Sequence, residues 1–207
     1  MAHIIFDFDG TLADSLPVLV DEYTRWSGQS EPLSADDQAR MRNMTAVQVL
    51  KELKIPLYKV PGLLVRGRDA LRYRINEVDL FLGMDEVVKH ASKDNSLYIM
   101  SSNSTMNIQA FLKRYKLSGY FADVKAGISV FGKAQHMRVF LKRRSIDRDD
   151  CYYIGDEIRD IEAAKRAKLR IISVTWGYNG EKILKKYRPD YLVTEPRQIT
   201  EIVAGNL

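Results

Sequence analysis

Residues 3–11 read HIIFDFDGT, a short apolar run that ends in two carboxylates, a glycine and a threonine. A run of this length, bounded by turn-forming residues, is typical of a strand buried on both faces of a sheet. Asp7 and Asp9 then lie at the carboxyl end of that strand, where acceptor-only oxygens can ligate a hard cation or attack an electrophile. The segment therefore predicts a buried strand with a chemical site beside it.

Further short apolar runs follow from residue 95 onward, separated by segments with helical periodicity. The runs are Leu97–Met100, Tyr152–Ile154, Ile171–Val174 and Tyr191–Val193. Between the first two, apolar side chains recur at helical spacing at Ile108, Phe111, Leu112 and Tyr115. Strands that alternate with amphipathic helices predict an α/β fold with a doubly wound parallel sheet, whose ligands lie beyond the carboxyl ends of its strands.

Residues 14–90 have a different pattern, with helical periodicity and no convincing strand. Asp14-Ser15 and Pro17 form a helix-start signal. The first apolar stripe consists of Leu16, Leu19, Val20 and Tyr23. We therefore predict two domains: an α/β core of residues 1–13 and 91–207, and a small all-helical domain of residues 14–90 inserted after the first strand.

Length and composition are those of a globular protein. The chain has 207 residues, of which 45% are apolar, enough for a sizeable core. No window approaches the roughly 18 apolar residues that a membrane span needs, and the first strand follows no secretory signal. Cys151 is the single cysteine, so no intrachain disulfide can form. We expect a cytoplasmic protein without a membrane partner, and its oligomeric state stays open between monomer and dimer.

The formal net charge of +5 raises the question of an anionic partner. The excess of Lys and Arg is scattered over helical segments such as Lys142–Arg144 and Lys165-Arg166, which is typical of solvated helix faces. No aromatic interleaving marks a track for single-stranded nucleic acid. We therefore do not expect nucleic acid as a partner.

Polar side chains follow several of the predicted strands. They are Ser101, Ser102 and Asn103 after Leu97–Met100, and Gly155, Asp156 and Glu157 after Tyr152–Ile154, with Asp160 one helical turn further on. Lys133 begins a predicted helix and could reach the same edge of the sheet as Asp7 and Asp9. Several carboxylates at one place repel each other unless a cation intervenes, and oxygen ligands favour Mg²⁺. We therefore expect a magnesium site.

These residues, in this order, resemble the four motifs of the haloacid dehalogenase-like hydrolase superfamily. The motifs are Asp7–Thr11, Ser102-Asn103 after an apolar strand, Lys133 after a glycine, and Gly155-Asp156 followed by Asp160. The inserted helices are similar to the cap domain of the branch that contains phosphoglycolate phosphatases and β-phosphoglucomutases. Trp176-Gly177-Tyr178 further downstream is also similar to this branch. The resemblance covers the predicted core and implies a Rossmann-like sheet with a helical cap.

The resemblance also implies a role for each matching residue. The implied catalytic residues are Asp7, Asp9, Ser102 and Lys133; substrate would be bound by Thr11, Ser102, Asn103 and Lys133, and Mg²⁺ by Asp7, Asp9, Asp156 and Asp160. Asp7 would form an aspartyl-phosphate, and Asp9 would protonate the leaving alcohol and then deprotonate the attacking water. Asp9 would join the metal through its backbone carbonyl, and Asp160 would hold Lys133 or a metal-bound water.

Two arginines of the insertion are further candidates for substrate binding. Arg68 lies in a basic stretch one helical turn from Arg72, so both could face the cleft and hold an anionic group. Arg42 lies just before an apolar stripe that begins at Ala46, in a loop that overhangs the active site in related proteins. Residues 10–14 and Gly83 are candidate hinges for the cap.

The residue at position 9 bears on the reaction class. A phosphomonoester needs a proton on its leaving oxygen and a halide does not, so Asp9 favours phosphoryl transfer over dehalogenation. We expect a Mg²⁺-dependent phosphatase that acts on a small phosphorylated metabolite, such as phosphoglycolate or a sugar phosphate, through an aspartyl-phosphate. Two alternatives stay open: a phosphomutase that uses the same two aspartates, and a phosphatase that processes polyanion or nucleic-acid ends.

Overall fold

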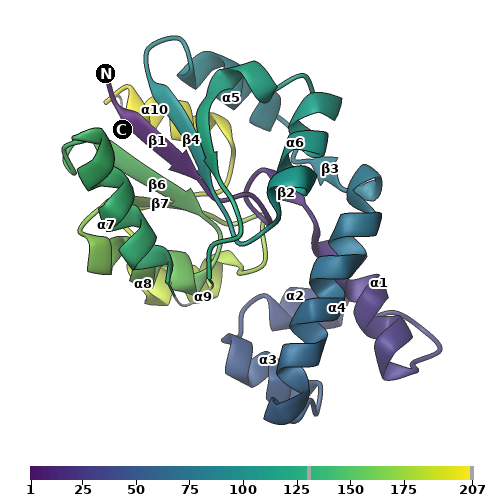
Figure 1. Cartoon of the computed structure of the whole chain (residues 1–207). Coiled ribbons are helices and arrows are strands. Elements are labelled where there is room, and N and C mark those ends of the chain that lie inside the picture. Colours follow the sequence, from purple (N-terminus) through teal and green to yellow (C-terminus); the bar gives the residue numbers. More distant parts are fainter. Residues whose placement is uncertain (130–131, 206–207) are drawn as a thin grey trace.

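The computed structural model describes residues 1–129 and 132–205, and a six-stranded sheet lies at its centre (Figure 1). In spatial order the strands are β5 (Phe121–Lys125), β4 (Ser96–Met100), β1 (His3–Phe6), β6 (Cys151–Gly155), β7 (Arg170–Val174) and β8 (Tyr191–Val193). Every neighbouring pair is parallel, and His3 of β1 lies beside Ser96 on one side and Cys151 on the other. The predicted α/β fold with a doubly wound parallel sheet is confirmed.

β1 is buried on both faces, which explains its uninterrupted apolar run. Ile4 and Phe6 point to one face and Ile5 to the other, because successive side chains of a strand alternate. On the first face lie α5 (Met84–Ala91), α6 (Thr105–Arg114) and α10 (Arg197–Val203); on the second lie α7 (Lys133–Arg144), α8 (Ile158–Ala167) and α9 (Glu181–Lys186). Two apolar clusters therefore hold the carboxyl end of β1 in a rigid frame.

Four helices between β1 and β4 lie apart from the sheet, at the lower right of Figure 1. They are α1 (Leu16–Ser27), α2 (Ala35–Met41), α3 (Ala46–Glu52) and α4 (Val60–Tyr73); short 3-10 helices occur at Leu57–Lys59, Ile75–Glu77 and Ser118–Tyr120. An antiparallel pair, β2 (Ala13–Asp14) and β3 (Asp79–Leu80), joins these helices to the core. The predicted insertion of residues 14–90 also includes α5, but α5 packs against α10 and the sheet. We therefore propose that the inserted domain ends at β3.

Local sequence signals explain where several helices begin. Thr45 caps α3, because its hydroxyl accepts from the Gln48 N–H while the Gln48 side chain accepts from the Thr45 N–H. Ser104 caps α6 by accepting from a backbone N–H of the first turn. Ser15 precedes α1 as the sequence predicts, but its hydroxyl bonds to Tyr178 Oη (2.6 Å) and not to the helix. The start of α1 is thereby connected to the loop after β7.

The sequence-based prediction missed the short strands β2 and β3, because no strand is predicted in residues 14–90. It also missed α2 and β5, and both of these lack a fully buried face. No residue of α2 is buried. β5 lies at the edge of the sheet, and its residues are half-buried or exposed. Hydrophobic periodicity detects elements that bury one face, so it gives little signal for either.

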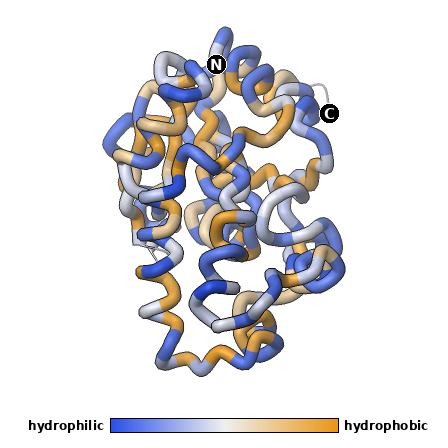
Figure 2. Tube along the Cα trace, turned by 90° about the vertical axis from the view of Figure 1, so that its right-hand side faces the viewer, coloured by the Kyte–Doolittle hydropathy of each residue, from blue (hydrophilic) through white to orange (hydrophobic). Residues whose placement is uncertain are grey.

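The helices are amphipathic along most of their length. In Figure 2, hydrophilic and hydrophobic residues alternate along the helical turns. Among the helices in residues 1–129 and 132–205, none combines the length and the apolar content that a bilayer crossing needs. Most of them bury one side against the sheet or against a neighbouring helix.

Phe8 should be essential for stability. Its side chain is fully buried and packs edge-on against Phe111 of α6, with 5.0 Å between ring centroids. We expect Phe8→Ala to lower the free energy of unfolding by about 3–5 kcal/mol, because it removes a buried ring and leaves a cavity. Urea unfolding measures this loss. Leu82→Ala is the control: Leu82 is 95% exposed, and its truncation should cost less than about 0.5 kcal/mol. Equal costs for the two variants would contradict the packing described.

Candidate active site

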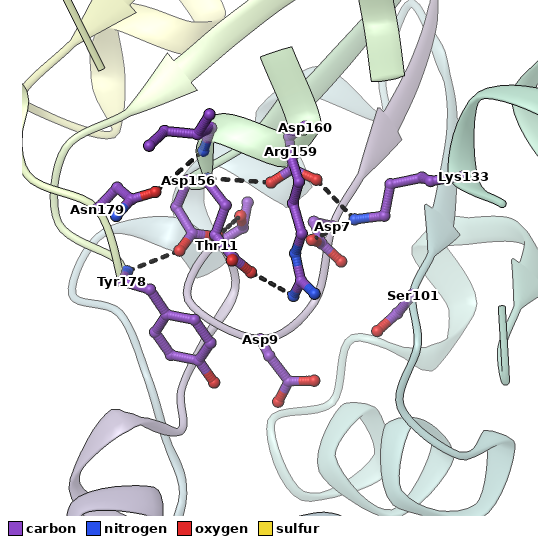
Figure 3. A network of polar contacts seen from close by, with 12 residues as sticks. Asp7, Asp9, Thr11, Ser101, Lys133, Asp156, Arg159, Asp160, Tyr178 and Asn179 are labelled. Atoms are coloured by element: carbon purple, nitrogen blue, oxygen red, sulfur yellow. Dashed lines mark hydrogen bonds and ion pairs between the residues drawn. The ribbon is translucent and has the colours of Figure 1, made fainter. Parts of the chain in front are cut away.

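The carboxyl edge of the sheet gathers the polar residues that follow β1, β4 and β6 (Figure 3). The residues after these strands are Asp7 and Asp9, Ser101, and Asp156. Lys133 and Asp160 reach the same place from the first turns of α7 and α8. Lys133 and Asp7 are 126 positions apart in the chain, and the fold brings them into contact.

Asp7, Asp156 and Asp160 form a buried acidic group. One oxygen of each carboxylate lies within 4.8 Å of the others; Asp7 is 4% exposed and the other two are fully buried. Lys133 Nζ donates to Asp7 Oδ2 (2.7 Å) and to Asp160 Oδ1 (2.6 Å). A single ammonium thus pairs with two of the three carboxylates.

Burial and mutual repulsion shift the pKa values within this acidic group. Burial raises the pKa of Asp7, and the charge of Lys133 only partly offsets the rise. Burial also raises the pKa of Asp156, together with the charges of Glu157 and Asp160. Burial lowers the pKa of Lys133, but the charges of Asp160 and Asp7 outweigh it and hold that pKa well above its usual value. With all three carboxylates ionised, the group and Lys133 would carry a net negative charge, which a divalent cation would balance.

The surroundings of Asp156 fit a metal site made of carboxylates. Thr11 Oγ1 donates to Asp156 Oδ1 (2.8 Å) and Tyr178 N donates to Asp156 Oδ2 (2.7 Å), so both oxygens have fixed directions. A Cβ atom at Gly10 or Gly177 would lie 2.2 or 2.3 Å from Asp156 Oδ2, so the backbone can approach this carboxylate only with glycine there. A donor set of oxygens alone favours a hard cation such as Mg²⁺.

The carboxylate of Asp9 lies outside the acidic group, and the sequence-based prediction assigns Asp9 to the metal through its backbone carbonyl, not through this carboxylate. Asn103 Nδ2 donates to both Asp9 oxygens (3.1 and 3.0 Å). Burial raises the pKa of Asp9 to about 6 and the charge of Asp7 adds to the rise, while hydrogen bonds from Ser15 and Asn103 oppose it. A carboxyl group with a pKa in this range can donate and accept a proton near neutral pH. The side chain of Asp9 is therefore suited to proton transfer.

Ser101, the neighbour of the predicted Ser102, points into the site. Ser101 is 1% exposed, and its hydroxyl is directed toward the space beside Asp7 and Asp9 (Figure 3). Its Oγ accepts from Asn103 N (3.0 Å). Ser102 is half-buried, and within the described part of the chain its hydroxyl takes part in no hydrogen bond. The sequence contained one indication of this: Ser101 directly follows β4, just as Asp7 directly follows β1.

The other predicted substrate-binding residues have structural partners or lie at the surface. Arg42 Nη2 donates to Thr175 O (2.6 Å), and Arg42 O accepts from Gly180 N (2.7 Å), so Arg42 connects the inserted helices to the loop after β7. Arg68 is exposed on α4 and forms no ion pair with the residues that the structure describes. Thr11 is fully buried against Asp156. The structure brings neither arginine into contact with Asp7 or Asp9.

Sequence-based reasoning missed Arg159, which directly precedes Asp160 on α8. Arg159 Nη2 forms an ion pair with Glu157 Oε1, and Figure 3 shows its side chain extending into the site. Burial raises the pKa of Glu157 to about 7, and the charge of Arg159 opposes this rise. The sequence contained one indication of its role: Arg159 lies in the first turn of α8, where a positive charge opposes the helix dipole and suggests an anionic partner.

Comparison with known proteins gives a consistent result. The family model of haloacid dehalogenase-like hydrolases matches residues 4–174. The chain is 33% identical over 206 residues to a phosphoglycolate phosphatase of Synechococcus elongatus, which covers 98% of this chain and 97% of that relative. Among solved structures, a haloacid dehalogenase-like hydrolase from Streptococcus pneumoniae has a TM-score of 0.79 at 20% identity, over 98% of both chains. A protein described as a predicted phosphoglycolate phosphatase from Haemophilus somnus has a TM-score of 0.74 at 19% identity, over 98% of this chain and 97% of its own.

Gly177→Ala should disturb the site through Asp156. The added methyl group would lie 2.2 Å from Gly10 O and 2.3 Å from Asp156 Oδ2, so the loop or the carboxylate must move. We expect a loss of about 1–3 kcal/mol in the free energy of unfolding, the usual cost of overpacking. Gly119→Ala is the matched control, because no atom lies within 4 Å of a Cβ there. Denaturant unfolding compares the two, and equal stability would contradict the close approach.

Proposed function

Because the chain belongs to the haloacid dehalogenase-like hydrolase family and is a phosphatase, we propose that it hydrolyses a small phosphomonoester with Mg²⁺ as cofactor. Phosphoglycolate or a sugar phosphate is the kind of substrate proposed, since the relative named phosphoglycolate phosphatase aligns with nearly the whole chain. The position of Asp7 carries the proposal. Its carboxylate lies at the end of β1, is held by Lys133 and has a proton-transfer group, Asp9, two residues away.

In the first step an oxygen of Asp7 attacks phosphorus and forms an aspartyl-phosphate. The bond between phosphorus and the ester oxygen breaks, and the leaving oxygen takes a proton from Asp9. Asn103 orients Asp9 for this transfer, because its amide donates to both carboxylate oxygens. The alcohol product leaves at this stage.

In the second step a water molecule attacks the phosphorus of the aspartyl-phosphate and gives a proton to Asp9. The bond between phosphorus and the Asp7 oxygen breaks, which releases inorganic phosphate and restores the Asp7 carboxylate. Asp9 regains the proton that it gave in the first step. The net reaction is hydrolysis of one phosphomonoester by one water molecule.

Lys133 and Ser101 would stabilise the charge on the phosphoryl group. Lys133 bridges Asp7 and Asp160, so its ammonium lies beside the attacking carboxylate. The Ser101 hydroxyl accepts from Asn103 N and keeps its own proton for a phosphoryl oxygen. Asp7, Asp156 and Asp160 would hold Mg²⁺, which supplies positive charge to the phosphoryl oxygens when bound.

Activity should require both a divalent cation and Asp7. We expect the wild type to release phosphate from an aryl phosphate with Mg²⁺ and to stop when EDTA is added. Asp7→Asn should lose at least about 10³-fold in kcat/KM, or about 4 kcal/mol of transition-state stabilisation, because an amide does not attack phosphorus. Asp85→Asn on α5 makes the same change at a surface ion pair with Lys89 and should retain activity. Phosphate release that survives both chelation and Asp7→Asn would refute the proposal.

The serines after β4 should differ in their effect on the same assay. We expect Ser101→Ala to lower kcat/KM by about 10- to 100-fold, because it removes a hydrogen bond to a charged oxygen worth about 1.5–3 kcal/mol. Ser102→Ala should change it by less than about threefold, since its half-buried hydroxyl has no hydrogen-bond partner among the described residues. A larger loss in Ser102→Ala than in Ser101→Ala would assign phosphoryl binding to Ser102.

A further inference from the structure

The active site holds one cation for which the reaction described above has no use. Arg159 is 36% exposed in its side chain, so it reaches the open part of the site. Its Nε atom is buried and has no hydrogen-bond acceptor among the described residues. Among residues 1–129 and 132–205, only the Glu157 side chain accepts a hydrogen bond from this guanidinium. A guanidinium has five N–H donors, so most of its donor capacity is unused.

The guanidinium of Arg159 lies close to the groups that would react. Figure 3 shows the side chain extending from α8 past Asp7 toward Asp9. Although burial raises the pKa of Asp7 and of Asp9, the charge of Arg159 is among the influences that lower both. A group that binds to Arg159 would therefore lie on the same side of the site as a phosphoryl group at Asp7.

The other cations considered for substrate binding are already in use or lie elsewhere. Lys133 donates to Asp7 and Asp160, so its ammonium lies where the phosphoryl group would bind. Arg42 also has a buried Nε without an acceptor among the described residues, but its Nη2 donates to Thr175 O in the loop after β7, and no contact joins it to Asp7 or Asp9. Arg68 is exposed on α4. Of these four cations, Arg159 is the one placed to bind a second anionic group on the substrate.

We propose that Arg159 binds a carboxylate that the substrate carries close to its phosphoryl group, so that the preferred substrates are phosphomonoesters of small hydroxy acids. The planar guanidinium matches a carboxylate through two parallel hydrogen bonds. Glu157 accepts from one Nη atom of Arg159, and no other acceptor among the described residues uses the remaining N–H donors. Because Arg159 and Asp7 point into the same small part of the site, a short acid is favoured over a long one. This inference rests on the proposed function, since the phosphoryl group must lie at Asp7.

Two esters of equal length test the proposal. In 2-phosphoglycolate a carboxylate follows the methylene group, and in 2-hydroxyethyl phosphate an uncharged hydroxymethyl group replaces it. The wild type should prefer 2-phosphoglycolate in kcat/KM. Arg159→Gln should lower kcat/KM for 2-phosphoglycolate by about 10- to 100-fold, mainly through KM, because a charged hydrogen-bonded pair is lost. The same variant should change kcat/KM for 2-hydroxyethyl phosphate by less than about threefold.

Two further variants separate charge recognition from a structural effect. Arg159→Lys should recover part of the loss, because a point charge still attracts a carboxylate but cannot bind it through a planar fork. Arg166→Gln makes the same change further along α8, where Arg166 is 66% exposed and pairs with Glu162, and it should leave both esters unaffected. Thermal unfolding of each variant verifies that the fold is intact.

Equal losses on both esters in Arg159→Gln would overturn the proposal and assign Arg159 to the phosphoryl group or to Asp7. A wild type without preference for 2-phosphoglycolate would overturn it as well. Calorimetric binding of 2-phosphoglycolate to Asp7→Asn, with and without Arg159→Gln, is independent of turnover. Equal affinities in that pair would overturn the role of Arg159 even if phosphate were released. If no ester is hydrolysed but the affinity falls about tenfold or more, the proposed function fails and the carboxylate contact stands.

Discussion

The excess negative charge at the carboxyl end of β1 is the constraint on which the rest of the structure depends. Asp7, Asp156 and Asp160 are buried within reach of one another, and Lys133 supplies one positive charge for three carboxylates. Such a cluster opposes folding unless the surrounding structure holds it in place. The two apolar clusters that pack on the faces of the sheet provide that support, because they fix β1 and β6 side by side. The unfavourable charge is thus confined to the one edge where a divalent cation can balance it.

The loop after β7 links this charged edge to the inserted helices. Tyr178 uses its backbone N–H to hold Asp156 and its hydroxyl to bond to Ser15, at the start of α1. In the same loop, Thr175 O accepts from Arg42. A movement of the inserted helices away from the core would have to break the contacts of Ser15 and Arg42, both of which end on this loop. The orientation of Asp156 and the position of the inserted domain are therefore not independent, although they are far apart in the chain.

The sequence predicted those parts of the molecule that repeat a pattern of burial. β1 and its parallel neighbours were recognisable because each is a short apolar run, and the carboxylates that follow them had to share an edge. β5 and α2 lacked such a pattern, since neither buries a complete face. The choice between Ser101 and Ser102 depended on where β4 ends, and periodicity does not define a strand end to within one residue. Contacts such as that of Arg42 with a distant carbonyl depend on the relative position of two domains, which local sequence does not encode.

Two cations in one site make recognition of two anionic groups possible without competition between them. Lys133 is a compact charge enclosed by Asp7 and Asp160, so it suits a phosphoryl group that bonds to Asp7. Arg159 has a planar, more exposed head held from one side by Glu157, so a flat carboxylate can approach it from the open part of the site. Selection for an acidic substrate would then arise from the first turn of α8, next to the reacting carboxylates, and the inserted helices would mainly control access. On this view, substrate preference and catalysis depend on the same short segment of α8, because Arg159 and Asp160 are adjacent there.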